Sequence, residues 1–263
     1  MIITSSQNSR IKMVRSLLAE RKEREQNQLY VVEGVRLAEE AISAAIKPQF
    51  ALFSNQLSGR GFEIVEMLKQ QSVDVEEVDT DLLGRISDTR SSQGILLVLD
   101  IPEESPRTDN HNILVLDQIS DPGNLGTLLR SAAGFGFNTV ITTPGSVDAY
   151  SPKVVRSAMG AHFKCSLLVR DAEGVKEFCK VVNNPPLRIL LADTQADRGC
   201  WELDLSLPLS LVIGSEADGP SPAMRSIVDE MVAIPINFGT ESLNAAVSGS
   251  ILMYEIYRQR NKP

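Results

Sequence analysis

The sequence predicts an α/β protein whose second half holds a largely parallel sheet. Short apolar runs, rich in β-branched residues or leucine, alternate with helical patterns from residue 113 to residue 234. Such alternation is typical of parallel strands with helices on both faces of the sheet. The hydrophobic fraction of 43% and the charged fraction of 23% are ordinary for a globular chain, and 263 residues suffice for one large or two small domains.

The first hundred residues are expected to form a compact α/β unit of their own. Residues 8–26 have the spacing of a polar, basic helix, and the apolar run Leu29–Val32 is expected to be a strand. Further along, helices are expected at 35–45 and 62–71, and strands at 50–53, 73–78 and 94–99.

The segment 101–110 is polar and contains two prolines, which is typical of a linker. It divides the chain into an N-terminal domain, 1–105, and a C-terminal domain, 106–263. The second domain ends in a long helical pattern at 242–260. Its six strands are expected at 113–116, 139–141, 166–169, 189–191, 209–213 and 231–234.

Charge and cysteine content restrict the classes of function. The net charge of −8 argues mildly against a nucleic-acid partner, but residues 1–36 carry seven basic and four acidic side chains. This basic end is either an RNA-binding arm or a solvated helix face. Three cysteines without C-x-x-C spacing favour reduced thiols and no metal site. The N-terminus lacks a signal-peptide layout and no apolar run is long enough for a membrane span, so we expect a cytoplasmic protein.

Three loops follow strands of the second domain, where parallel sheets bind ligands. The first, 117–130, contains Asn124 and Arg130, and a guanidinium suits phosphate; the alternative is an ordinary strand–turn–helix. The second, 214–222, contains Glu216, which either contacts a ribose or an arginine, and Ser221, which is expected to cap a helix. No loop has a dinucleotide-binding or P-loop motif.

The third loop, 235–246, precedes the last helix. Ser242 or Thr240 is expected to cap that helix, with Asn244 inside its first turn. The small residues that follow suit close packing against either a ligand or another helix.

Together the three loops read D-x-x-x-D-P-G-N-x-G-x-x-x-R, V-I-G-S-E-x-x-G and I-P-I…S-L-N-A-A-V. In this order they resemble the three motifs of the SpoU/TrmH family of RNA 2′-O-ribose methyltransferases, over about residues 113–260. The stretches N-S-R-I-K at 8–12 and V-E-G-V-R at 32–36 look like the N-terminal substrate-binding extension of that family, which resembles a ribosomal protein fold.

The resemblance implies a SPOUT fold, in which the C-terminal end of the α/β sheet carries a deep trefoil knot, and a homodimer formed through the C-terminal domain. It implies S-adenosylmethionine as cofactor, held mostly by backbone groups. The positions that match the cofactor-binding residues of the family are Ala192, Asp193, Thr194, Gly214, Ile234, Leu243 and Ala245. Those that match its catalytic positions are Asn124, Arg130, Glu216, Ser242 and Asn244.

The family mechanism makes Arg130 a general base. Arginine rarely gives up its proton, so a phosphate clamp that stabilises the developing alkoxide is the alternative role, with Asn124 and Glu216 orienting the guanidinium. Structured RNA is the expected partner, ribosomal RNA in preference to transfer RNA. Its expected contacts in the N-terminal domain are Arg10, Lys12, Arg15 and Arg36.

Three other functions compete with this interpretation. A knotted methyltransferase acting on a base nitrogen would lack the Asn124 and Arg130 combination, which is present here. An RNA-binding module without catalysis would have a damaged motif, and all three motifs are intact. An acidic α/β enzyme for small nucleotides would leave the basic N-terminal helix unexplained.

Overall fold

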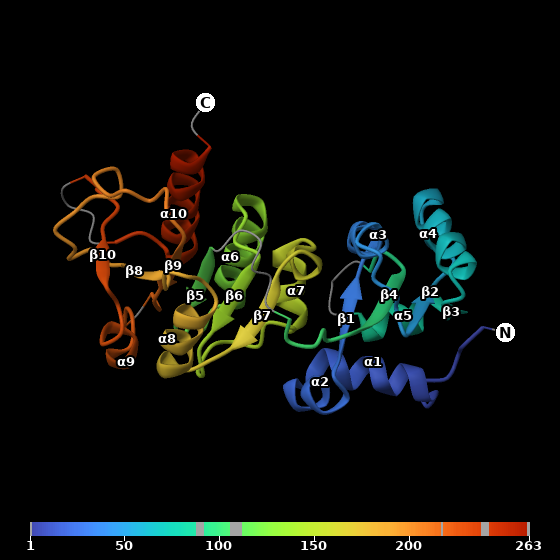
Figure 1. Ribbon diagram of the computed structural model, residues 1–263. Helices are drawn as coiled ribbons and strands as arrows, with labels where there is room; N and C mark the ends of the chain where they lie inside the picture. The colour runs from blue at the N-terminus through green and yellow to red at the C-terminus, as the bar shows by residue number, and fades with distance from the viewer. Residues whose placement is uncertain (1, 88–91, 106–111, 217, 238–241, 262–263) are drawn as a thin grey trace. The chain divides into compact units, whose positions relative to one another are not determined.

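The computed structural model describes residues 2–87, 92–105, 112–216, 218–237 and 242–261. The chain forms two compact units (Figure 1). The first comprises residues 1–103 and 150–163, and the second comprises residues 104–149 and 164–263. A segment from beyond the expected linker therefore packs with the N-terminal unit. Residues 106–110 of that linker lie outside the described part of the chain.

The first unit is built on a mixed four-stranded sheet. Its strands are β1 (Leu29–Glu33), β2 (Phe50–Phe53), β3 (Asp74–Glu77) and β4 (Ile95–Asp100), in the order β1-β4-β2-β3. β4 is antiparallel to both β1 and β2, whereas β2 and β3 are parallel. The four strands lie within or close to the stretches expected from the sequence.

The basic N-terminal helix is broken in two, where a single helix at 8–26 was expected. α1 (Ser9–Ala19) ends at Glu20, which is extended (φ −120°), and α2 (Arg21–Asn27) follows directly. The break brings the buried guanidinium of Arg24 to the carbonyl oxygen of Leu17, to which it donates a hydrogen bond. Arg24 thus satisfies a backbone acceptor at the end of α1, where helices leave carbonyls unpaired.

Three further helices complete the N-terminal part of this unit. They are α3 (Val35–Ser43), α4 (Gly59–Gln70) and α5 (Thr80–Ile86). α5 was not expected from the sequence, because seven residues give too short a periodic pattern. Its N-cap is nevertheless a typical one, because the side chain of Asp79 accepts a hydrogen bond from the backbone N–H of Leu82 (3.0 Å).

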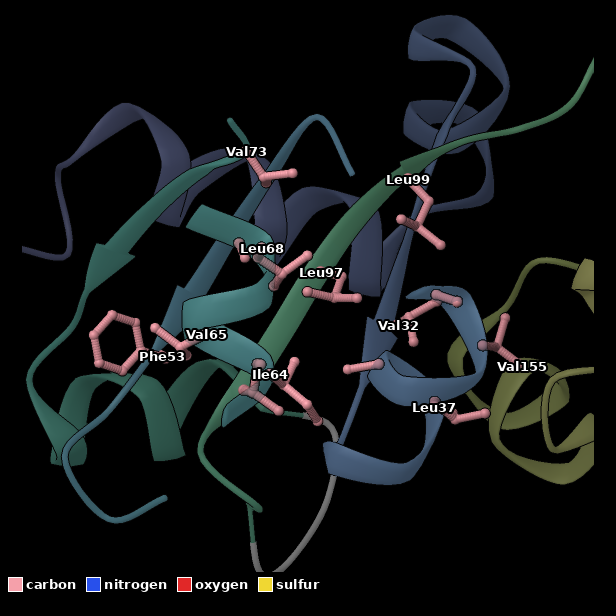
Figure 2. Close-up of a cluster of buried hydrophobic side chains, with 14 of the residues drawn as sticks. Val32, Leu37, Phe53, Ile64, Val65, Leu68, Val73, Leu97, Leu99 and Val155 are labelled. Atoms are coloured by element: carbon pink, nitrogen blue, oxygen red, sulfur yellow. The ribbon is translucent and has the colours of Figure 1, made fainter. Parts of the chain in front are cut away.

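Apolar side chains pack on both faces of the mixed sheet. One face carries α1 and α5, and the other carries α3 and α4. Figure 2 shows the cluster on the face that carries α3 and α4, in which Val32 and Leu37 lie close to Val155. Val155 belongs to α7 (Pro152–Ala158), which precedes a single 3₁₀ turn (Ala161–Phe163). The segment 150–163 thus belongs to the hydrophobic core of the N-terminal unit.

The second unit contains six parallel strands, which confirms the predicted sheet type. Their spatial order is β10-β8-β9-β5-β6-β7. β6 and β7 thus lie on one side of β5, and the later strands β8, β9 and β10 lie on its other side, so the strand order reverses after β7. The strands are β5 (Ile113–Leu116), β6 (Thr139–Thr142), β7 (Ser166–Val169), β8 (Arg188–Ala192), β9 (Leu209–Ile213) and β10 (Glu230–Val232).

Helices cover both faces of this sheet (Figure 1). α8 (Ala172–Val181) and α9 (Pro222–Arg225) lie on one side, with α6 (Pro122–Phe135) and α10 (Ala245–Arg260) on the other. α10 approaches α6 closely at Gly249, where a Cβ atom would lie 2.4 Å from Cδ2 of Leu128. No described helix has the length and hydropathy needed to cross a membrane.

Candidate functional site

The main candidate site is a cavity at the carboxyl edge of the parallel sheet, with a volume of about 280 Å³. Its walls come from the segments that follow β8, β9 and β10 and from the first turns of α10. These strands lie on one side of the point where the strand order reverses. Ligands of open α/β sheets bind at such a point, beyond the carboxyl ends of the strands.

The loop after β9 folds tightly on itself at the cavity. Ser215 and Gly219 exchange two backbone hydrogen bonds of 3.1 and 3.0 Å, and Gly219 has φ +67°, which favours glycine. Gly214 is also required sterically, because a Cβ atom there would lie 2.4 Å from the backbone nitrogen of Pro220. The glycines therefore fix the shape of this wall.

A buried carboxylate ties this loop to the neighbouring strand. Asp117 directly follows β5 and is 1% exposed. One of its oxygens accepts from the hydroxyl of Thr143 (2.8 Å), and the other accepts from the backbone N–H of Ser221 (2.7 Å). Ser221 caps α9, as the sequence predicted, through a hydrogen bond from Met224 N–H (3.2 Å). Asp117 opens the first motif, but it was not predicted to be a site residue.

Three predicted catalytic residues meet in one hydrogen-bonded group. Asn124 Nδ2 donates to Oε1 of Glu216 at 2.6 Å, and Asn244 Nδ2 donates to Asn124 Oδ1 at 3.1 Å and also to Oε1 of Glu216. The backbone N–H of Ala245 adds a third hydrogen bond to the same carboxylate oxygen (3.2 Å). Side chains up to 120 residues apart thus form one polar cluster, which we call the Asn–Glu–Asn group.

The start of α10 differs from the expectation. Asn244 is the N-cap and not a residue of the first turn, and its Oδ1 accepts from the backbone N–H groups of Ala246 (3.0 Å) and Val247 (3.2 Å). Asparagine is favoured at an N-cap because it pairs donors that the helix leaves free. Ser242 does not cap the helix but lines the cavity, and Thr240 lies outside the described residues.

Arg130 stands apart from the Asn–Glu–Asn group. It lies on α6 and is exposed, and no hydrogen bond or ion pair connects it to another described residue. Six residues turn an α-helix through about 600°, so Arg130 projects about 120° away from Asn124. The expected orientation of Arg130 by Asn124 and Glu216 is therefore not seen within this chain.

All seven residues predicted to bind the cofactor line the cavity. They come from three segments and are Ala192, Asp193, Thr194, Gly214, Ile234, Leu243 and Ala245. Sequence reasoning missed other lining residues, among them Gln195, Ile236 and Arg225. Arg225 lies four residues after Ser221, which the sequence identifies as an N-cap. This spacing of one helical turn was a signal that could have located Arg225.

Arg225 forms an ion pair across the cavity wall. Its Nη2 lies 2.6 Å from Oδ2 of Asp193, whose side chain is only 5% exposed. The other oxygen of Asp193 accepts from the backbone N–H of Gln195 (2.8 Å). The pair links the segment after β8 to α9.

The predicted RNA-binding residues differ in their surroundings. Arg10 is engaged inside its own unit by Asp74 and by Glu76, the latter at 3.1 Å, and its guanidinium lies 4.8 Å from the ring centre of Phe50. The hydrogen bond between Arg10 and Asp74 raises the pKa of the guanidinium and lowers that of the carboxyl group.

The other three predicted RNA-binding side chains are exposed, and none of them forms a hydrogen bond or ion pair with another described residue: Lys12, Arg15 and Arg36.

The cysteines offer no reactive site. Cys165, Cys179 and Cys200 are buried thiols outside any disulfide, and burial raises the pKa of the Cys179 thiol to about 11. A thiol with a raised pKa is a poor nucleophile at neutral pH. Among the described residues, no three His, Cys, Asp or Glu side chains cluster as metal ligands would.

Comparison with known protein families gives two matches, which together span most of the chain. Residues 111–254 match the SpoU rRNA methylase family, and residues 8–97 match the MRM3-like substrate-binding domain. An uncharacterised tRNA/rRNA methyltransferase of Synechocystis is 31% identical, over 98% of this chain and 94% of the relative. The 23S rRNA (guanosine(2553)-2′-O)-methyltransferase of Bacillus subtilis is 28% identical, over 97% and 98%.

Solved structures have the same architecture. The SpoU methyltransferase AviRb of Streptomyces viridochromogenes, in complex with AdoMet, superposes with a TM-score of 0.87 at 26% identity, over 97% of this chain and 100% of that one. A structure described as an RNA 2′-O ribose methyltransferase gives a TM-score of 0.82 at 32% identity, over 99% of both chains. The similarity thus covers both units of the molecule.

Proposed function

The chain belongs to the SpoU rRNA methylase family, and from this premise we propose that it transfers a methyl group from S-adenosylmethionine to a ribose 2′-hydroxyl of ribosomal RNA. The observation that carries the proposal is the Asn–Glu–Asn group beside the cavity. It joins the three motifs at the place where a parallel sheet binds ligands.

The lining of the cavity suits S-adenosylmethionine. Ile213, Val232, Ile234 and Leu252 supply apolar surface for an adenine ring. The volume of about 280 Å³ is near the lower limit of small-molecule pockets. When bound, the cofactor supplies an electrophilic methyl group.

The residues of the chain would act mainly by orientation. A methyl transfer requires the ribose oxygen in line with the bond being broken, and holding that geometry accounts for a large part of the acceleration. The Asn–Glu–Asn group fixes the start of α6, the loop after β9 and the start of α10 relative to one another. Ser242 shapes the cavity beside them.

Arg130 is proposed to clamp the phosphate next to the target ribose and to stabilise the developing alkoxide. Because Arg130 points away from Asn124 in this chain, we propose that it completes the site of a partner subunit. Arg130→Lys keeps the charge but loses the planar fork, so the rate of methyl transfer should fall at least tenfold. A variant with the full wild-type rate would rule out the bidentate clamp.

A homodimer formed through the C-terminal domain follows from the same proposal. α10 supports it, because one of its faces exposes Val247, Ile251, Tyr254 and Tyr257, with fractional exposures of 46%, 38%, 52% and 44%. An apolar strip of this kind is typical of an interface. Light scattering should give about twice the chain mass of 28.8 kDa, and the mass of a monomer would contradict the proposal.

The N-terminal domain is proposed to bind structured RNA, with Lys12, Arg15 and Arg36 as the contacts that remain exposed. Ribosomal RNA is favoured because the MRM3-like substrate-binding match covers residues 8–97 and the relative from Bacillus subtilis is named for 23S rRNA. Transfer RNA is the second candidate, since the Synechocystis relative is named for both RNAs.

Three further features complete the proposal. The C-terminal chain is proposed to form the trefoil knot of the SPOUT fold, supported by the way the segments after β8, β9 and β10 surround one cavity. The functional division at residues 105 and 106 and the cytoplasmic location stay predictions.

Mapping of ribose methylation tests the proposed activity directly. RNA from cells with and without this protein should differ at one or a few 2′-O positions of ribosomal RNA. A site in transfer RNA would shift the substrate to the second candidate. A change at a base nitrogen, with every ribose unchanged, would contradict the proposed reaction.

A further inference from the structure

The cavity carries an uneven set of charges. Among the described residues that line it, Arg225 is the only cationic side chain, whereas Asp193 and Glu216 are acidic. S-adenosylmethionine has a cationic sulfonium and ammonium group but only one anionic group, the carboxylate of its methionine moiety. A lone arginine in a wall that is otherwise neutral or acidic is matched to that one group.

The surroundings of Arg225 hold it without using up its donors. Its Nη2 pairs with Asp193 at 2.6 Å, and no other hydrogen bond or ion pair joins the side chain to a described residue. A guanidinium has five N–H donors in a rigid fork, so most of them remain available. The side chain is 44% exposed, and it borders the cavity from α9.

Asp193 is itself committed to the protein. One oxygen accepts from the backbone N–H of Gln195 at 2.8 Å, and the other faces Arg225. With both oxygens engaged and 5% of its side chain exposed, Asp193 is suited to hold Arg225 and not to bind a ligand directly.

We propose that Arg225, held in place by Asp193, binds the carboxylate of the methionine moiety of the methyl donor. Arg225 is then a cofactor-binding residue and Asp193 a positioning residue. The inference rests on the proposed function, since it assigns one end of the same cavity. It orients the donor, with its amino-acid end toward α9.

A pair of ligands that differ only in this group tests the proposal. S-adenosylhomocysteine and its decarboxylated analogue, S-adenosyl-3-thiopropylamine, are titrated into the whole protein by calorimetry. Wild-type protein should bind S-adenosylhomocysteine about 10- to 100-fold more tightly, as a charge-assisted hydrogen bond provides. Arg225→Ala should remove this preference and leave the Kd for the analogue unchanged, which also shows that the variant is folded.

Further variants separate binding from positioning. Arg225→Lys should recover part of the preference, and Asp193→Asn should lose part of it, again with no change for the analogue. Arg198→Ala is the matched control, because Arg198 is similarly exposed and ion-paired, to Glu230 at 3.0 Å, but does not line the cavity. It should behave as wild type.

Several results would overturn the inference. A loss of equal size for both ligands in Arg225→Ala, or no loss for either, would show that the carboxylate does not contact Arg225. If wild-type protein bound neither ligand, the proposed function would fail first and the inference with it. Binding of both ligands by wild-type protein with equal Kd leaves the proposed function intact and refutes the carboxylate contact alone.

Discussion

The Asn–Glu–Asn group and the basic N-terminal helix are two polar regions that the sequence marked for function. In the first, Asn124, Glu216 and Asn244 come from distant segments and bond to one another. In the second, Arg10 turns inward to Asp74 and Glu76, while Lys12 and Arg15 stay exposed. The difference teaches that ordered motifs identify a site, whereas a local excess of charge identifies only a surface, part of which the fold itself uses.

Removal of Glu216 should have the largest effect, because its carboxylate joins all three segments of the group. Glu216→Ala leaves Asn124, Asn244 and the backbone N–H of Ala245 without their common acceptor. We expect methyl transfer to slow about 100-fold, corresponding to about 3 kcal/mol of lost stabilisation. The rate under saturating cofactor and RNA measures this.

Asp218→Ala is the control for this variant, since Asp218 lies in the same loop, is exposed and has no hydrogen bond to its carboxylate among the described residues. If both variants slowed methyl transfer equally, the rate would depend on the loop as a whole and not on the Asn–Glu–Asn group. The contrast between the two polar regions would then be lost.

The contact between α6 and α10 gives the next largest effect. In Gly249→Ala the new methyl group would meet Leu128 at 2.4 Å and Ile213 at 3.3 Å, so the free energy of unfolding should fall by about 1–3 kcal/mol. Gly134→Ala on α6 is the matched control, because no atom lies within 4 Å of its added Cβ, and it should gain up to about 1 kcal/mol. Urea denaturation distinguishes the two, and equal shifts would refute the tight packing.

The smallest expected effects separate two arginines of α1. Arg15→Ala should weaken RNA binding several-fold and reduce the slope of log K against log salt by about 1, with the stability unchanged. Arg10→Ala should instead lower the free energy of unfolding by about 1 kcal/mol, a discounted value because its ion pairs are partly exposed. The reverse pattern would mean that Arg10 is the RNA contact.

The sequence revealed more of the site than of the local fold. Apolar runs located β2, β5, β6 and β9 because these strands are buried along their whole length, and the resemblance of the three loops to the family motifs indicated the cavity lining. Periodicity could not reveal the break at Glu20, because the spacing of apolar residues does not show that the Arg24 side chain donates to the carbonyl oxygen of Leu17. Nor could it show that Val155 belongs to the core of the N-terminal unit, since the packing partners of a helix are set by the tertiary fold.

The two arginines to which we assign a role in the site show the same limit. The motif identified Arg130, but only the geometry of α6 shows that it points away from Asn124. Arg225 lies in a stretch with no motif of its own, and it borders the cavity paired with Asp193, 32 residues earlier in the chain. Contacts of this kind are properties of the fold and have no local pattern.

A crystal structure of the protein soaked with S-adenosylhomocysteine tests the central claim most directly. The account predicts the ligand in the cavity between the segments after β8, β9 and β10, in contact with Gly214, Ile234 and Leu243 and beside Glu216. Ligand bound at another face of the molecule, with this cavity empty at saturating concentration, would contradict it.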